Sequence, residues 1–336
     1  MENANYKSFL SDVSKHPNSV LVRNNCVSEP SGGYGLITVG ITCFSEGDWL
    51  LECWESVLAQ TDDRWEAVLV MDGGASARTR EIFEQLDHPK LRKFKMPENV
   101  GPYPARNKAF ELTQTRYHFY LDGDDQLMPN SVAVVLKTFE KHPDAAFVYG
   151  DYQCFGADNA VWRYHPVVTA QDLVESQSTP GPCAYKVETW LQLGGWAKEL
   201  GRGNADYDFL LGAFEADLRG CHCGETFYRY RVGHSGRVSQ SYKRHHHETH
   251  EIMVRRHPGF FSNHGRRNRF LALGYRRAAI ANSDAGDIET AARLAWSAWS
   301  RGMWGDRSVQ LLILQSWLSP WIYRMLRRAW RIVTFR

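Results

Sequence analysis

Alternation of hydrophobic and polar positions divides residues 35–155 into short apolar runs and amphipathic stretches. The strand-like runs lie at 36–41, 65–71, 91–96, 117–122 and 146–152. Between them, apolar residues recur at helical spacing at 49–58, 103–114 and 129–141. Short β-rich runs that alternate with amphipathic helices are typical of strands joined by helical crossovers. The pattern therefore predicts a doubly wound α/β layer.

Changes in this pattern predict three regions. Residues 1–34 are polar, with scattered prolines and a Ser-Gly-Gly run, and are predicted to be an N-terminal extension. The α/β pattern begins at residue 35, weakens after about 155 and extends to about 260. From residue 261 the apolar spacing is helical, with a helix pair expected around a turn at 284–287. We therefore predict an extension (1–34), an α/β domain (35–260) and a helical C-terminal region (261–336).

The overall composition narrows the class of protein. The chain has 336 residues, 43% of them hydrophobic, which is enough to form a core. Its net charge of +2 disfavours a globally basic nucleic-acid binder. The seven cysteines are an odd number, and residues 1–11 lack the pattern of a signal peptide, so we expect a reduced, cytoplasmic protein. No apolar run reaches the roughly 18 residues of a bilayer-spanning helix. Any membrane contact is therefore expected to be peripheral, at the inner face of the cell membrane.

Carboxylates follow the strand-like run at 117–122. The string Tyr-His-Phe-Tyr-Leu-Asp-Gly-Asp-Asp at 117–125 ends in three carboxylates around Gly123. Ligands of open α/β sheets bind beyond the carboxyl ends of strands, so Asp122 and Asp124 are expected to face a ligand. Their oxygens suit Mg²⁺ or Mn²⁺ bridging a diphosphate. A solvated Asp-Gly turn is the alternative, and the position after a strand favours the ligand site.

Two further segments could contact a nucleotide. Asp72 follows the strand-like run at 65–71 and precedes two glycines, although a turn alone explains this equally well. The segment at 98–110 contains a Gly-Pro-Tyr-Pro loop, after which Arg106 opens a helix where it could pair with phosphate. A surface arginine at a helix start is the alternative. The three sites together favour a common ligand.

The order of these motifs along the chain is more specific than any one motif. The series comprises Ile-Thr-Cys-Phe-Ser-Glu-Gly (41–47), Glu-Ser-Val-Leu-Ala-Gln-Thr (55–61), Met-Asp-Gly-Gly (71–74), an Asn-x-Gly-x-x-x-Ala-Arg-Asn loop (99–107) and Asp-Gly-Asp (122–124). From 35 to about 240 the chain resembles family 2 glycosyltransferases of the GT-A fold, with the last motif matching their DxD motif. The resemblance implies a central, mostly parallel sheet flanked by helices, with a helical C-terminal appendage. It also implies metal-dependent, inverting transfer of a hexose-type sugar from a nucleotide-diphosphate donor.

The resemblance assigns four residues to the donor base. Thr42, Phe44 and Glu46 are implied to border the base. Asp72 is implied to accept a hydrogen bond from it. The loop at 42–46 departs from the Thr-Tyr-Asn sequence that is more familiar in the family.

Five further residues are implied near the diphosphate and the metal. Arg106 would help to hold the donor. Asp122 would contact the ribose or the metal, and Asp124 would ligate the Mg²⁺ or Mn²⁺ that neutralises the leaving diphosphate. The segment at 227–240 resembles the Tyr-Arg-x-His-x-x-Ser segment that closes many family members. By that likeness His234 would ligate the metal or touch the diphosphate, and Arg231 would add positive charge; a surface histidine and arginine without a role are the alternative.

The acceptor side is implied by segments 181–196 and 204–217. The first resembles the family segment that ends in Gly-Gly-Trp, and the second fits the Glu-Asp motif at a helix start. Asp206 then stands at the position of the catalytic base, which must reach the acceptor hydroxyl. An aspartate that offsets the helix dipole is the alternative. Ala205 replaces the usual glutamate, which makes the assignment of the base and of the acceptor type depend on Asp206 alone.

The C-terminal residues suggest a membrane surface. From Arg307 to Arg336 there are six arginines and no acidic residue, with three tryptophans among aliphatic residues. Such a stretch can lie in an anionic membrane interface, and Pro320 argues against one spanning helix. A helix pair that packs on the catalytic domain is the alternative. Membrane contact would serve an enzyme whose acceptor is lipid-linked.

Two rivals to an active glycosyltransferase remain. A sugar nucleotidyltransferase shares an α/β nucleotide-binding layer, but it should have a Gly-rich, Lys- or Arg-containing phosphate loop near the first strand, which residues 41–47 lack. A catalytically degenerate sugar-nucleotide-binding or scaffold protein is kept open by Ala205. The predicted partners are therefore a nucleotide-diphospho-sugar donor and a glycan or lipid-linked acceptor.

Overall fold

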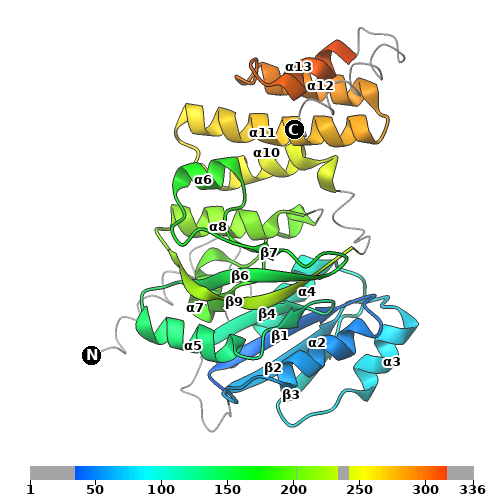
Figure 1. Ribbon diagram of the computed structural model, residues 1–336, viewed down its shortest axis with the longest axis vertical. Coiled ribbons are helices and arrows are strands. Elements are labelled where there is room, and N and C mark those ends of the chain that lie inside the picture. Colours follow the sequence, from blue (N-terminus) through cyan, green and yellow to red (C-terminus); the bar gives the residue numbers. More distant parts are fainter. Residues whose placement is uncertain (1–34, 202, 234–241, 316–336) are drawn as a thin grey trace. The chain divides into compact units, whose positions relative to one another are not determined.

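A computed structural model describes residues 35–201, 203–233 and 242–315 (Figure 1). The described chain divides into two compact units. The first contains residues 35–168, 178–201 and 205–233, and the second contains residues 169–177, 203–204 and 242–315. No helix within these ranges is both long and apolar enough to cross a membrane.

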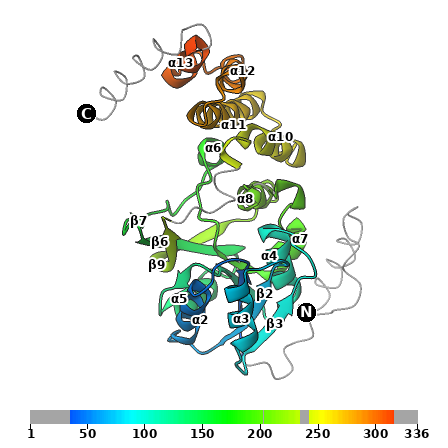
Figure 2. The same ribbon diagram turned by 90° about the vertical axis from the view of Figure 1, so that its right-hand side faces the viewer.

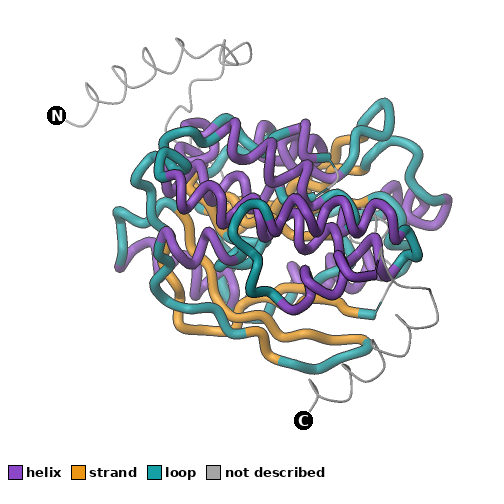
Figure 3. Tube along the Cα trace, turned by 90° about the horizontal axis from the view of Figure 1, so that it is seen from above, coloured by secondary structure: helices purple, strands orange, loops and turns teal. Residues whose placement is uncertain are grey.

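The first unit is built on one mixed sheet with the strand order β3-β2-β1-β4-β8-β6-β9-β5, and β7 pairs with β6. The first four strands pair in parallel: β1 (Ile37–Cys43), β2 (Trp65–Met71), β3 (Leu91–Lys95) and β4 (Tyr117–Asp122). The later strands pair in both directions: β5 (Gln126–Leu127), β6 (Phe147–Gly156), β7 (Val161–Trp162), β8 (Ala184–Lys186) and β9 (Gly220–Val232). Figure 3 follows these strands in orange.

Helices cover both faces of the parallel part of the sheet, because alternate residues of a strand point to opposite sides. The larger core cluster combines Ile37, Val39 and Ile41 with side chains from α2 (Trp49–Leu58), α3 (Ala77–Gln85) and α5 (Ser131–Lys141). Val68 and Val70 face the other way and pack on Ala105 and Ala109 of α4 (Pro102–Glu111). Figure 2 shows the ribbons of these helices beside the sheet. The unit also contains α7 (Val187–Leu193), the 3-10 turn η1 (Lys198–Leu200) and α8 (Ala205–Glu215).

The alternation in sequence located these elements closely. The predicted strands at 65–71 and 117–122 match β2 and β4 residue for residue. β1 continues two residues beyond the predicted end at 41, so Thr42 lies in the strand, opposite Asp122 of β4. After residue 155, where the pattern weakens, the sheet nevertheless continues through β8 and β9.

The second unit is helical in its described residues. It comprises α6 (Ala170–Glu175), α10 (His246–Arg256), α11 (His264–Asp284), α12 (Ile288–Trp299) and α13 (Arg307–Gln315). The predicted helix pair around 284–287 is confirmed, and the Asp287 side chain caps α12 by accepting from Thr290 N at 3.1 Å. Arg269 of α11 makes two 2.9 Å hydrogen bonds to the Glu175 carboxylate of α6.

Candidate functional site

The turn after β4 is packed against the end of β1. Gly123 N donates to Thr42 O at 2.9 Å, and Asp125 N donates to Asp122 O at 3.0 Å. A Cβ atom at Gly123 would lie only 2.9 Å from that Thr42 oxygen, so the turn needs glycine for close approach to β1. The carboxyl ends of these parallel strands therefore bring Thr42 and the acidic turn together.

Arg106 connects this turn to α4. The helix begins at Pro102, and Arg106 lies buried in its second turn. Its Nη2 is 2.7 Å from both carboxylate oxygens of Asp122, and its Nε is 3.2 Å from Oδ1. The guanidinium also lies over the Tyr120 ring, 4.6 Å from the centroid. Burial lowers the pKa of Arg106, but Asp122 and Tyr120 raise it well above its ordinary value, so the group stays charged.

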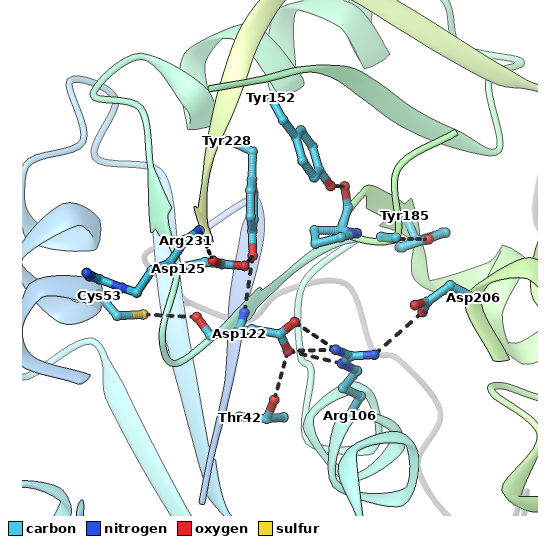
Figure 4. A network of polar contacts seen from close by, with 12 residues as sticks. Thr42, Cys53, Arg106, Asp122, Asp125, Tyr152, Tyr185, Asp206, Tyr228 and Arg231 are labelled. Carbon is cyan, nitrogen blue, oxygen red and sulfur yellow. Dashed lines mark hydrogen bonds and ion pairs between the residues drawn. The ribbon is translucent and has the colours of Figure 1, made fainter. Parts of the chain in front are cut away.

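Asp206 approaches the same guanidinium from the first turn of α8. Its Oδ1 is 3.6 Å from Arg106 Nη1, so one cation lies between two carboxylates (Figure 4). The Asp206 Oδ1 atom is buried and makes no hydrogen bond within the described residues. Burial raises the pKa of Asp206 from its ordinary value, and Arg106 opposes this rise. A buried carboxylate with spare hydrogen-bonding capacity is suited to accept a proton.

Asp206 also borders the segment predicted for the acceptor. A Cβ atom at Gly181 would lie 3.0 Å from Asp206 Oδ2 and 2.9 Å from the Tyr120 hydroxyl. Asn107, next to Arg106 in α4, accepts from Trp196 N and donates to Trp196 O, both at 2.9 Å. Both ends of the segment 181–196 are thus held at this part of the unit.

Glu46 and Asp124 add negative charge to the site. Burial raises the pKa of Glu46 to about 7, and the nearby Asp124 and Asp122 carboxylates contribute to the rise. The Cγ atom of Glu46 lies 3.4 Å from the position of a Cβ at Gly123. Arg106 is bound to Asp122, so the remaining acidic groups suit an added cation. In the described part of the chain, however, no group of three His, Cys, Asp or Glu side chains is arranged to hold a metal ion.

A second set of bonds holds the acidic turn to β9. Asp125 is buried and accepts from Arg231 N at 2.7 Å and from the Tyr228 hydroxyl at 2.9 Å. The Arg231 side chain donates to Asp124 O and to Glu52 Oε2, both at 2.7 Å. Its guanidinium also lies over the Phe155 ring, 4.3 Å from the centroid. Arg231 therefore holds the backbone of the turn.

Asp72 also makes bonds within the protein. Its Oδ1 accepts from Gly73 N and Val100 N, and its Oδ2 accepts from Gly101 N, each at 2.9 Å. Three of the roughly four lone-pair sites of the carboxylate are therefore used, two of them to hold the loop at 99–101. The implied bond to a donor base would use the remaining site and stays a prediction.

The structure brings some of the site residues predicted from the sequence together and leaves others elsewhere. The structure brings Arg106, Asp122 and Asp206 into one network that includes Thr42, whose hydroxyl is 3.5 Å from Asp122 Oδ1 (Figure 4). Phe44 packs against the larger core cluster while its backbone oxygen accepts from Ser76 N. His234 lies outside the described residues.

Sequence reasoning missed three participants: Tyr120, Asp125 and Tyr228. Tyr120 and Asp122 are two residues apart in β4 and share a face, a signal that the strand prediction already contained. Asp125 was part of the acidic string but received no role. Tyr228 could not be linked to it, since the two residues are 103 positions apart.

The comparison with known families agrees with this arrangement. The model of the family described as Glycosyl transferase family 2 matches residues 38–188. Over these residues the chain is similar to glycosyl transferase family 2. The matched range includes β1, β2, β4 and α4, while Asp206 and Tyr228 lie beyond it.

Curated relatives match part of the chain. A putative teichuronic acid biosynthesis glycosyltransferase, TuaG of Bacillus subtilis, is 30% identical over 125 residues, which are 37% of this chain and 49% of the relative. An uncharacterised glycosyltransferase of Haemophilus influenzae is 26% identical over 164 residues, covering 47% of this chain and 54% of the relative. The chain therefore spans about half the length of these relatives.

Solved structures share the fold. The S. aureus protein TarS, residues 1–349 in complex with UDP-GlcNAc, superposes with a TM-score of 0.60 at 13% identity, covering 83% of this chain and 91% of that chain. A mannosyltransferase from Pyrobaculum calidifontis in complex with GDP-Man and Mn²⁺ has a TM-score of 0.51 at 17% identity, covering 98% and 94%. The chain therefore has the GT-A fold.

Proposed function

We propose that this protein transfers a sugar from a nucleotide-diphosphate donor to a hydroxyl group of a glycan or lipid-linked acceptor. The observation that carries the proposal is the pairing of Arg106 with two carboxylates, Asp122 at the end of β4 and Asp206 at the start of α8. These are the residues to which the family resemblance assigns the donor side and the catalytic base. The similarity to family 2 and the GT-A fold support the same reaction class.

Asp206 would act as the general base. Its raised pKa brings its basicity closer to that needed to take a proton from a hydroxyl group near neutral pH. The deprotonated acceptor oxygen would then attack the anomeric carbon in line with the leaving diphosphate. A single displacement of this kind inverts the anomeric configuration and needs no covalent intermediate.

Thr42, Glu46, Asp122 and Asp124 would hold the donor. They lie at the carboxyl ends of β1 and β4, where open α/β sheets bind ligands. Asp72 would contact the base through its remaining lone pair. Arg231 would contribute positive charge, and would also hold the backbone of the turn at Asp124.

Mg²⁺ or Mn²⁺ fits the charge of this site. Burial raises the pKa of Glu46, and the neighbouring Asp124 and Asp122 carboxylates add to the rise, a contribution that a bound cation would oppose. A cation that bridges phosphates needs one or two protein carboxylates, with substrate oxygens and water as the other ligands. Asp124 would be the main ligand, with His234 as a second, and the bound cation would stabilise the charge of the leaving diphosphate.

The names of similar proteins suggest substrate classes. TarS was solved with UDP-GlcNAc, the Pyrobaculum enzyme with GDP-Man, and TuaG is named for teichuronic acid biosynthesis. We therefore propose a uridine or guanosine diphosphate sugar as donor and a cell-surface polysaccharide as the product.

Calorimetry with a panel of nucleoside diphosphates and nucleotide sugars, with and without Mn²⁺, tests the proposal. We expect one base to bind with metal-enhanced affinity, and the corresponding nucleotide sugar to be slowly hydrolysed. Binding without hydrolysis or transfer to any polysaccharide acceptor would instead support the degenerate binding protein. If no nucleotide bound, both the active glycosyltransferase and the degenerate binding protein would be excluded.

We further propose that the C-terminal residues contact an anionic membrane surface. Two large hydrophobic side chains that precede this segment in the sequence are exposed, Trp296 at 47% and Trp304 at 64%. Val309 and Leu312 of α13 are buried, so the arginine- and tryptophan-rich residues 316–336 are the segment to delete. Flotation with anionic liposomes should fall on this deletion, and equal flotation of both proteins would contradict the proposal.

A further inference from the structure

The hydroxyl group of Tyr228 joins the two ends of the acidic turn. It donates to Asp125 Oδ2 at 2.9 Å and accepts from Asp122 N at 3.3 Å. The other Asp125 oxygen accepts from Arg231 N at 2.7 Å. The turn that carries Asp122 and Asp124 is therefore fastened to β9 at its first and last residues (Figure 4).

The Tyr228 ring is held independently of its hydroxyl group. It is fully buried and stacks on Tyr152 with ring centroids 4.7 Å apart. It also contacts Phe119 of β4, with centroids 6.5 Å apart. Because the ring is fixed by these aromatic neighbours, the hydroxyl group can act as a rigid support for the turn.

We propose that Tyr228 is a positioning residue that sets the direction of the Asp122 and Asp124 carboxylates toward the donor diphosphate and its cation. This inference rests on the proposed function and deepens it. Tyr228 itself touches neither ligand, because its hydroxyl group is occupied by the backbone of Asp122 and the side chain of Asp125. It acts through the turn, as the outer partners of metal ligands do.

Tyr228→Phe removes only the hydroxyl oxygen. The phenyl ring can keep the stack on Tyr152, but Asp122 N and Asp125 each lose a partner in a buried place. The turn should relax, and the two carboxylates should bind the cation of the donor diphosphate less well. Loss of an outer partner typically lowers metal affinity by about 10- to 100-fold, so we expect a decrease of at least roughly tenfold.

Tyr152→Phe is the matched control. Tyr152 is also buried in the same aromatic stack, and its hydroxyl group donates to Pro182 O at 2.5 Å, away from the turn. Both substitutions thus delete one buried, hydrogen-bonded hydroxyl group. A purely structural role for Tyr228 predicts equal effects on thermal stability and on ligand affinity for the two variants.

The full-length protein is titrated with Mn²⁺, followed by electron paramagnetic resonance, in the presence of UDP and separately of GDP. We expect the apparent Mn²⁺ affinity of Tyr228→Phe to fall at least tenfold and that of Tyr152→Phe to stay within twofold of the wild type. Asp125→Asn, which disturbs the same bonds from the other side, should resemble Tyr228→Phe.

Equal affinities in Tyr228→Phe and Tyr152→Phe would overturn the positioning role while leaving the proposed function intact. If the wild type bound Mn²⁺ with neither nucleotide, the proposed function would fail and this inference with it. The two failures are distinguishable, since the first compares variants and the second concerns the unmodified protein alone.

Discussion

Arg106 lies between two carboxylates that are held differently. Asp122 receives a bidentate bond with contacts of 2.7 Å, whereas Asp206 is 3.6 Å from the nearest guanidinium nitrogen. The tighter contact fixes Asp122 beside the acidic turn. The looser one offsets part of the cost of burying Asp206.

Asp206→Asn should abolish sugar transfer and retain donor binding. The amide has the shape of the carboxylate but cannot take a proton, so kcat should fall by about 10² to 10⁴. Single-turnover transfer and calorimetry with the donor measure the two quantities separately. Asp124→Ala is the complement, since it should weaken metal-dependent donor binding. Full turnover by Asp206→Asn would refute the base assignment.

Arg106→Met should move the acidic limb of the pH–rate profile. Transfer requires ionised Asp206, whose pKa is raised by burial and lowered by Arg106. Activity therefore falls as the pH drops through this pKa, and removal of the nearby cation should move the limb upward by about one pH unit or more. Arg106→Lys keeps a charge and should move it less. An unmoved limb with a lower plateau would show that Arg106 serves only to bind.

Helix α4 couples the two sides of the site through consecutive residues. Arg106 contacts the acidic turn and Asp206, while Asn107 binds the backbone of Trp196 with two 2.9 Å hydrogen bonds. Ala105 and Ala109 of the same helix pack on β2. The position of α4 on the sheet therefore determines where the donor-side and acceptor-side groups meet.

Asn107→Ala should destabilise the first unit. Trp196 N and O would lose their partners in a buried place, at a cost of about 2 kcal/mol in the free energy of unfolding. Thermal and urea unfolding measure the loss. Lys108→Ala is the control in the same helix, because its bond to Glu111 is exposed and should contribute less than about 1 kcal/mol. Equal losses in the free energy of unfolding for Asn107→Ala and Lys108→Ala would mean that Asn107 does not anchor the segment at Trp196.

The two compact units have separate stabilising features. The first depends on a sheet with a large apolar core, and the second on helices with buried polar groups. His250 of α10 is fully buried against the Phe270 ring, with centroids 4.1 Å apart, and its Nδ1 bonds to Phe270 O at 2.8 Å. Burial lowers the pKa of His250 to about 3, although the Phe270 bond opposes this.

The second unit should therefore lose stability in acid. An unfolded histidine titrates near 6.5, so between roughly pH 6.5 and 3 the unfolded chain binds a proton that the folded unit does not. Stability is therefore lost as the pH falls, by roughly 1 kcal/mol at pH 5.5 relative to neutral pH. Urea unfolding at both pH values measures it.

A histidine variant separates this effect from general acid sensitivity. His250→Gln removes the buried titrating group, so the free energy of unfolding should depend less on pH, whatever its value at neutral pH. The exposed His142 of the first unit is the control, and His142→Gln should leave the pH dependence as in the wild type. Identical pH dependence in His250→Gln and the wild type would contradict the assignment to His250.

The amino-acid order was enough to locate the strands of the parallel half-sheet and the helices α2, α4 and α5, but not α3, and to put Asp122 at a strand end. β2 and β4 were predicted residue for residue, because both are short apolar runs whose side chains are buried on both faces of the sheet. The ordered motifs also indicated the family. These signals are local or depend only on order along the chain.

Contacts between distant segments depended on packing. Three contacts join side chains to groups that periodicity cannot relate. They are the pairing of Arg106 with Asp206, the Tyr228 bond to Asp125, and the bonds of Asp72 to the backbone at 100–101. Periodicity indicates the face on which a residue lies, whereas a hydrogen bond requires two atoms within about 3 Å. Only strand register, the placement of α4 and α8, and the removal of water bring those atoms together, and the same burial raises the pKa of Asp206.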